Sequence, residues 1–293
     1  MVLNAVKYGT TTAGHTYPAV KIVAIVSEDY STKANELEST HALLIAQSDY
    51  DRISADPVNA LPGQKVLLTP ASTAQMYAEY CFAGWNITLD RMTIIKRNQQ
   101  EEIRKALEDK TANIAIAWSP FTYLAETGPA KAKILPCSNM PNIQVPTFIV
   151  ARSDLLTEPD AGRLASNRQE IGAFVANYLG AWSAAKNKPQ DAAKRLVKTY
   201  ADEGIHVSES QARTELSARQ PPNLADQRIA LAAPTGGVTP LTSNLDVIMN
   251  FMIRSGTLKS EERPAASDLI DPSILNFIDA DAPLKARAEG KTD

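Results

Sequence analysis

The sequence predicts an α/β fold built as two lobes with a cleft between them. Short apolar runs alternate with amphipathic segments over the first half of the chain, which is typical of α/β proteins. The 293 residues are enough for two lobes, and 44% hydrophobic with 22% charged residues is ordinary for a globular protein. After about residue 160 the apolar runs end and long helical patterns follow.

The apolar runs are expected to form strands in largely parallel sheets. Lys21–Ser27 is dense in β-branched residues, so we expect a strand that is buried on both faces. The other expected strands are His41–Ala46, Lys65–Thr69, Met92–Ile95, Ala112–Trp118, Lys133–Leu135 and Thr147–Ala151.

The helices are expected between and after these strands. Ser72–Ala83 begins with a capping residue, and Gln99–Glu108 has apolar residues on one face. Further helices are expected over Asn167–Lys186, Pro189–Ala201, Ser208–Leu216 and Leu245–Gly256. Acidic residues such as Glu101 and Glu108 fall on helix surfaces, where a charged solvent-facing side is the expected role.

Two candidate linking strands, His41–Gln47 and Val145–Ala151, bracket a compact βαβαβ segment. We therefore predict that residues 48–146 form lobe 2, and that residues 1–47 with 147–293 form lobe 1. Because the chain would cross between the lobes twice, a cleft is expected there. Such clefts hold small ligands and close by hinge motion.

Composition argues against several classes of function. The net charge of −3 disfavours nucleic acid as a partner, because phosphate binding needs a basic face. No apolar run approaches the roughly 18 residues of a membrane span, and the N-terminus lacks the pattern of a secretory signal. The sequence shows no nucleophile elbow and no partner for its histidines, so no catalytic set is predicted.

Cysteine and histidine are both scarce. Cys81 and Cys137 are too few for a zinc site, and His15, His41 and His206 are far apart in the sequence. No metal and no cofactor is therefore predicted. We expect two buried thiols, with a Cys81–Cys137 disulfide as the alternative.

The stretch from Leu61 to Gln75 is the most informative. A strand ends at Thr69, and Ser72 and Thr73 open a helix whose free N–H groups and positive dipole end form an anion site. The two hydroxyls would add neutral donors. Ser and Thr also cap many helices that bind nothing, so a purely capping role stays open.

Two other polar or aromatic clusters could face a ligand. Thr10, Thr11 and Thr12 lie in a stretch between glycines, where an ordinary turn is the alternative. Trp118 ends an apolar strand just before Pro120, and an aromatic at that end of a strand often points into the crevice. The alternative for Trp118 is a place in the core.

The order of motifs resembles the nitrate/sulfonate/taurine family of ABC-transporter substrate-binding proteins, most closely its taurine-type branch. No single motif is specific, but their order and spacing from about residue 9 to 280 are. The matching stretches are Leu61-Pro-Gly-Gln-Lys-Val66 with Ala71-Ser-Thr73, Asn113-Ile-Ala-Ile-Ala-Trp-Ser-Pro120, Pro146-Thr-Phe-Ile-Val-Ala-Arg-Ser-Asp154, Gln220-Pro-Pro-Asn-Leu-Ala-Asp-Gln227, Phe251-Met-Ile-Arg-Ser-Gly256 and Asp271-Pro-Ser-Ile-Leu275.

The resemblance implies a periplasmic-binding-protein type II fold and a non-enzymatic protein. It would capture a small oxyanion-bearing solute in the periplasm and pass it to a membrane permease and its ATPase, touching the membrane only peripherally. Ser72 and Thr73 would hold the oxyanion, and Thr10–Thr12 would face it from the other lobe. Trp118 and Phe121 would pack on its organic part, and Gln75 and Thr147 complete the predicted ligand set.

Two departures from the family pattern bear on this expectation. The strand, helix and strand that precede the part matching Tyr8–Ala24 are not found here, so lobe 1 is expected to be incomplete. Taurine-type members have an Asp soon after Pro-Thr, whereas Phe148 and Ile149 stand there and cannot pair with an ammonium. Taurine is therefore not the expected ligand. An enzyme on the same fold, of the pyrimidine-precursor or menaquinone-pathway type, and a non-functional fragment are the alternatives.

Overall fold

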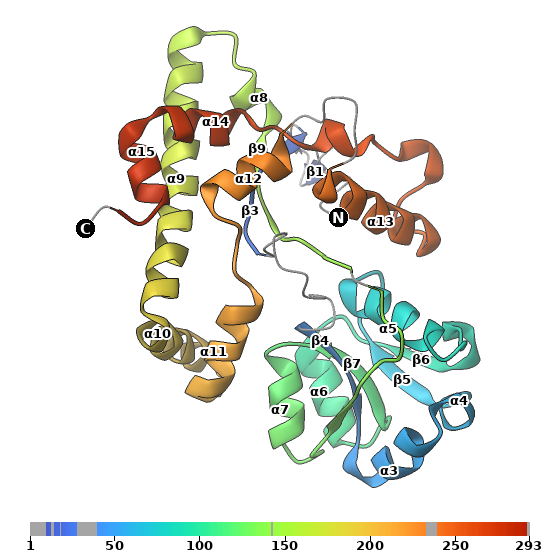
Figure 1. The fold of residues 1–293 in the computed structure, drawn as a ribbon. Helices are drawn as coiled ribbons and strands as arrows, with labels where there is room; N and C mark the ends of the chain where they lie inside the picture. The colour runs from blue at the N-terminus through green and yellow to red at the C-terminus, as the bar shows by residue number, and fades with distance from the viewer. Residues whose placement is uncertain are drawn as a thin grey trace. The chain divides into compact units, whose positions relative to one another are not determined.

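The computed structural model describes residues 10–12, 15–17, 19–27, 40–141, 143–232 and 239–291. The chain divides into two compact units. The first unit contains Met1–Lys33, Val145–Pro189 and Arg219–Asp293, and the second contains Ala34–Gln144 and Gln190–Ala218. Figure 1 shows the elements of both.

The second unit is built on a five-stranded sheet in the order β6-β5-β7-β4-β8. Each of its strands arises from one of the predicted apolar runs, and their bounds are β4 His41–Ile45, β5 Lys65–Leu68, β6 Thr93–Lys96, β7 Ile114–Trp118 and β8 Lys133–Leu135. β5 pairs in parallel with β6 and β7, but β4 pairs antiparallel with β7 and β8. The prediction of largely parallel sheets is therefore wrong for this strand, which enters the sheet between two neighbours running the other way.

Side-chain alternation assigns the two faces of this sheet. Leu44, Leu67 and Ala115 point to the face covered by α6 (Gln100–Glu108) and α7 (Phe121–Thr127), where they form one apolar cluster with Ile103. The intervening residues of β4 and β7 point to the other face. α5 (Thr73–Ala83) packs there with its buried Met76, Tyr77 and Phe82.

Two further pairs of helices belong to the second unit. α3 (Gln47–Ala55) and α4 (Pro57–Ala60) follow β4. α10 (Pro189–Asp202) and α11 (Glu209–Ala218) come from later in the chain. The Tyr123 hydroxyl of α7 lies 3.5 Å from Oε2 of Glu215, a buried carboxyl on α11.

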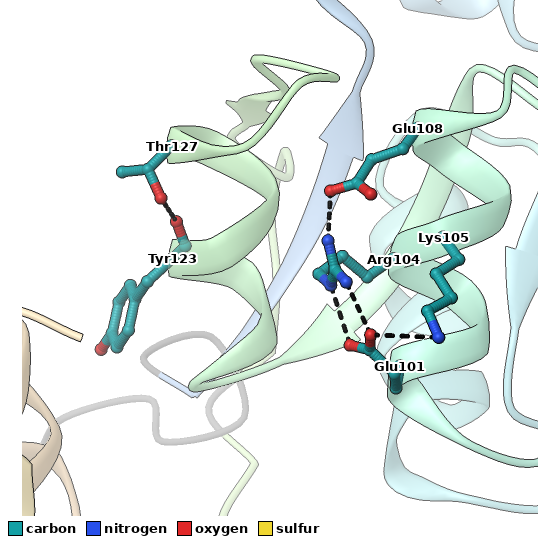
Figure 2. Close-up of polar contacts among 6 residues, drawn as sticks. All are labelled: Glu101, Arg104, Lys105, Glu108, Tyr123 and Thr127. Carbon is teal, nitrogen blue, oxygen red and sulfur yellow. Dashed lines mark hydrogen bonds and ion pairs between the residues drawn. The ribbon is translucent and has the colours of Figure 1, made fainter. Parts of the chain in front are cut away.

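The exposed side of α6 carries the charges that the sequence placed there (Figure 2). The Arg104 guanidinium donates to both oxygens of Glu101 and to Glu108, and Lys105 lies 3.7 Å from the same Glu101 carboxylate. Hydrogen bonding from Arg104 lowers the pKa of Glu101, and the Glu101 carboxylate raises that of Arg104. These carboxylates are partners in a helix-surface ion-pair network, so they are not candidates for acid or base chemistry.

A disulfide joins Cys81 of α5 to Cys137, which follows β8. The expectation of two thiols is wrong, because the chain after β8 returns across α5 and brings the two Cα atoms to 5.0 Å. Gly84 is what permits this approach, since a Cβ at that position would lie 1.7 Å from the carbonyl oxygen of Ser138.

The first unit has a two-stranded antiparallel sheet of β3 (Val20–Ile25) and β9 (Phe148–Arg152), so the prediction of largely parallel sheets is wrong here as well. Ile22 to Ile25 are at most 1% exposed, as expected for a strand buried on both faces. β1 (Thr10–Thr12) pairs with β2 (His15–Tyr17).

Helices make up the rest of the first unit. The 27-residue helix α9 (Ala161–Asn187) carries α14 and α15 against its side (Figure 1). α13 has Thr239 as its cap and Pro240 in its first turn, and it ends before Gly256, whose φ of 75° stops the helix. The remaining bounds are α8 Ser153–Leu156, α12 Leu224–Leu231, α13 Pro240–Arg254, η2 Ser260–Glu262, η3 Ala266–Leu269, α14 Ser273–Ala280 and α15 Ala282–Ala288.

The compact units depart from the predicted lobes in two long segments, and Val145 and Pro146 fall in the first unit instead of lobe 2. β4 lies in the second unit, because its partners are β7 and β8, whereas the prediction gave His41–Gln47 to lobe 1. Residues 190–218 also group with the second unit, although they were predicted in lobe 1. The periodicity that identifies a helix carries no information about which unit it packs on.

Gln227 explains one of the matching motifs of the late chain. Its side chain is fully buried, accepts a hydrogen bond from Ile25 N at 2.8 Å and donates to the carbonyl oxygens of Ile25 and Pro222 at 3.0 and 3.1 Å. It therefore fixes α12 to the end of β3.

Gln227→Met is expected to reduce the free energy of unfolding by about 3 kcal/mol, since each buried backbone group left without a partner costs about 1–3 kcal/mol. Urea unfolding followed by circular dichroism would measure the loss. Gln190→Met, on an exposed site of α10, is the matched control and should change stability by less than about 0.5 kcal/mol. Equal stability of the two variants would contradict the proposed role of Gln227.

Candidate functional site

The predicted ligand residues of the second unit gather at one edge of its sheet. β5 and β7 run parallel and end at Leu68 and Trp118, so their carboxyl ends meet at that edge. β4 runs the opposite way, and its first residue, His41, pairs with Trp118. Ligands of open α/β sheets bind at the carboxyl ends of parallel strands, where loops lead into helices.

The start of α5 is organised by Ser72 and Gln75. Ser72 Oγ accepts from Ala74 N at 3.1 Å and donates to the carbonyl oxygen of Thr69 at 2.7 Å, so Ser72 caps the helix. The Gln75 amide accepts from Ala71 N at 2.8 Å and donates to Glu79 Oε1 at 3.1 Å. Both side chains hold the turn in shape. The cap engages one first-turn N–H, and by helix geometry the N–H groups of the first turn point out of the helix end.

Thr73 is engaged differently, by His41. His41 Nε2 lies 2.7 Å from Thr73 Oγ1, and Nδ1 lies 2.9 Å from Thr40 Oγ1. The ring stacks on Tyr77 of α5, with centroids 5.8 Å apart, and meets the Trp118 ring at 6.1 Å. A half-buried imidazole thus lies between the helix start and the aromatic end of β7.

Gln100, at the start of α6, ties the strand ends together. Its amide is 4% exposed, accepts from Trp118 N at 3.2 Å and donates to Thr69 Oγ1 at 3.2 Å. The chain after β7 is fixed to the residue before β4 by Ser119 N, which donates to the carbonyl oxygen of Thr40 at 2.9 Å. This edge of the sheet is therefore a polar surface that hydrogen bonds hold in place, with aromatic rings along one side.

The structure brings together part of the predicted set. Ser72, Thr73, Gln75 and Trp118 lie at this edge, and half-buried Phe121 begins α7 just after it. Thr10–Thr12 form β1 of the first unit, and their side chains lie outside the described part of the chain. Thr147 also belongs to the first unit, where it is exposed and its carbonyl oxygen accepts from Val26 N. A ligand role for these four threonines stays a prediction.

Sequence reasoning missed the residues that organise the edge, chiefly His41, Gln100 and Tyr77. His41 reads as the polar first residue of an apolar run, and only the antiparallel direction of β4 places it beside Trp118. Gln100 reads as one more polar residue of an amphipathic helix. A glutamine at the first position of α6 was the available signal, and it indicates a site only weakly unless the sheet topology is known.

Metal and membrane roles find no support in the described ranges. No group of three or more His, Cys, Asp or Glu side chains among them is placed to hold a metal ion. Within the same residues, no helix has both the length and the apolar character needed to cross a bilayer.

The first unit contains a separate pocket of about 230 Å³. Its walls come from α9, the start of α12 with the segment before it, and the end of α15, and they include Trp182, Lys186 and Pro222. Its lining is mainly apolar. The start of α12 lines it, but it lacks the paired Ser-Thr hydroxyl groups found at the sheet edge of the second unit.

Solved structures of solute-binding proteins share this fold. The periplasmic aliphatic sulphonate binding protein SsuA from Escherichia coli superposes with a TM-score of 0.60 at 12% identity, over 86% of this chain and 69% of that one. A ligand-binding component of an ABC-type import system from Staphylococcus aureus, with zinc bound, gives 0.57 at 15% identity over 88% and 73%. The periplasmic nitrate-binding protein NrtA from Synechocystis PCC 6803 gives 0.51 at 10% identity over 97% and 70%.

No protein-family model matches the sequence. No curated protein matches it either. At these identities the likeness establishes the architecture alone. This chain has the α/β periplasmic-binding-protein fold that its sequence predicts.

Proposed function

We propose that this protein is the solute-binding component of an ABC importer and captures a small organic oxyanion, such as a sulfonate or a carboxylate. The observation that carries the proposal is the start of α5, where Thr73 and the first-turn N–H groups lie beside His41 and Trp118 at the carboxyl edge of the sheet. The fold is that of proteins whose names specify sulfonate or nitrate binding.

The chemistry of this edge suits an anion with an apolar part. The positive end of the α5 dipole and the N–H donors of its first turn favour negative charge. The Thr73 hydroxyl adds a donor, and the Trp118 ring supplies an apolar surface. A neutral solute of the same shape would use the surface but not the dipole.

The Cys81–Cys137 disulfide supports a periplasmic location. Disulfides persist in oxidising compartments, including the bacterial periplasm, and are rare in the cytosol. We infer that the protein works there and delivers its solute to a membrane permease with an ATPase subunit. Its contact with the membrane would then be indirect.

Titration calorimetry with matched probes tests the proposed function. Ethanesulfonate, nitrate and acetate are compared with ethyl methyl sulfone, which has a similar shape and no charge. At least one anion should bind, and the sulfone should bind at least about tenfold more weakly, the equivalent of about 1.4 kcal/mol. Equal binding of sulfone and sulfonate, or no binding of any anion, would overturn the proposal.

A further inference from the structure

His41 has both ring nitrogens engaged by hydroxyl groups. Nδ1 faces Thr40 at 2.9 Å and Nε2 faces Thr73 at 2.7 Å. A neutral imidazole has one N–H donor and one acceptor nitrogen, whereas an imidazolium has two donors. The charge state of the ring therefore decides what the Thr73 hydroxyl can do.

When Nε2 carries no proton, the Thr73 hydroxyl donates its hydrogen to Nε2 and cannot donate it to a ligand. When Nε2 carries a proton, Thr73 Oγ1 accepts from it, and the hydroxyl hydrogen is released for another acceptor. An imidazolium guarantees the second arrangement. It also adds a positive charge beside the first turn of α5, where an anion is proposed to bind.

The empty site and the occupied site favour opposite charge states of His41. The start of α5 is the positive end of a helix dipole, which disfavours an adjacent cation when no anion is present. A bound oxyanion reverses this balance, because it attracts the imidazolium and accepts the released hydroxyl hydrogen.

We infer that His41 is a positioning residue that couples oxyanion binding to proton uptake, by turning the Thr73 hydroxyl into a donor toward the ligand. This inference rests on the proposed function. Free imidazole titrates near pH 6.5, so coupling is expected within the physiological range. Because binding favours the protonated ring, affinity is greatest at low pH and falls as pH rises.

Among the described residues, the aromatic side chains that contact the ring come from α5 and β7. α5 contributes Tyr77, and a phenol stays neutral below about pH 10. β7 contributes Trp118, which is not titratable. The carboxylate on α5, Glu79, accepts from the Gln75 amide.

Calorimetric titrations of ethanesulfonate from pH 5.5 to pH 8.0 test the coupling, because the charge of this probe is constant over that range. The affinity of the wild-type protein should fall about tenfold as pH rises across it. Repeating the titration at pH 6.5 in two buffers of different ionisation enthalpy should show uptake of a fraction of a proton.

Three variants identify the residue responsible. His41→Gln should bind more weakly at pH 5.5 and lose the pH dependence, and His41→Asn replaces it if the first variant does not fold. His206→Gln, at an exposed position on the connection between α10 and α11, is the matched control and should keep the wild-type profile.

The outcomes separate the two proposals. If no oxyanion binds the wild-type protein, the proposed function and the coupling both fall. If ethanesulfonate binds with an affinity that is constant from pH 5.5 to 8.0, the coupling alone is wrong. The same conclusion follows if His41→Gln keeps the pH dependence of the wild-type protein.

Discussion

Replacing both Cys81 and Cys137 by Ala is expected to lower the free energy of unfolding by about 4 kcal/mol. The disulfide closes a loop with a sequence separation of 56 residues. The chain-entropy relation for such a loop gives about 4 kcal/mol of stabilisation through the unfolded state. Guanidinium unfolding of the oxidised wild-type protein and the double variant would measure the difference.

Reducing agent provides the control for this prediction. It should destabilise the wild-type protein and leave the double variant unchanged. Thiol titration of denatured, unreduced protein should find no free cysteine, because Cys81 and Cys137 are the two cysteines of the chain. A difference below about 1 kcal/mol, or two titratable thiols in the wild-type protein, would contradict the disulfide and weaken the argument for an oxidising compartment.

The disulfide also bears on the candidate site. The Tyr77 hydroxyl lies 3.0 Å from Cys137 Sγ, and the Tyr77 ring stacks on His41. The disulfide therefore helps to hold the Tyr77 ring, on which the His41 imidazole stacks. Anion affinity of the Cys81→Ala/Cys137→Ala variant should fall with its stability, whereas the Gln227→Met change in the first unit should lower stability alone.

Changing both Ser72 and Thr73 to Ala is expected to weaken anion binding at least about tenfold, since each hydrogen bond to a charged group contributes about 1.5–3 kcal/mol. The two single variants should differ. Ser72→Ala removes the cap and should cost about 1 kcal/mol of stability in the absence of ligand. Thr73→Val removes the hydroxyl bonded to His41 and should account for most of the lost affinity.

A second helix cap in the same unit supplies the control. Ser208 Oγ accepts from Gln211 N at the start of α11, so Ser208→Ala should cost similar stability and leave binding unchanged. Calorimetry on the folded variants measures affinity, and urea unfolding measures stability. If the Ser72→Ala/Thr73→Ala variant binds as tightly as the parent while losing stability, both residues are structural and the site lies elsewhere.

Local sequence patterns predict the elements of this protein well, because each rests on interactions between neighbours in the chain. The β-branched run Lys21–Ser27 became the buried β3, and the capped segment from Ser72 became α5. Local patterns do not specify the direction of a strand or the strands with which it pairs. The antiparallel course of β4 follows from its place between β7 and β8, which no periodicity specifies.

The candidate site was predictable to the same extent. Ser72 and Thr73 follow the end of one strand and Trp118 ends another, so their gathering at one edge could be expected. His41 and Gln100 could not, since His41 reaches the edge through the reversed strand and Gln100 through a tertiary contact with Thr69. The disulfide could not be predicted either, because it requires the chain after β8 to pass close to Gly84.

The most direct test of the central claim is a crystal structure of the protein with ethanesulfonate at saturating concentration. The sulfonate oxygens are expected within hydrogen-bond distance of Thr73 Oγ1 and of first-turn N–H groups of α5, with the ethyl group against Trp118. A sulfonate bound elsewhere, such as in the pocket beside Lys186 and Pro222, with the start of α5 left empty, would contradict the account.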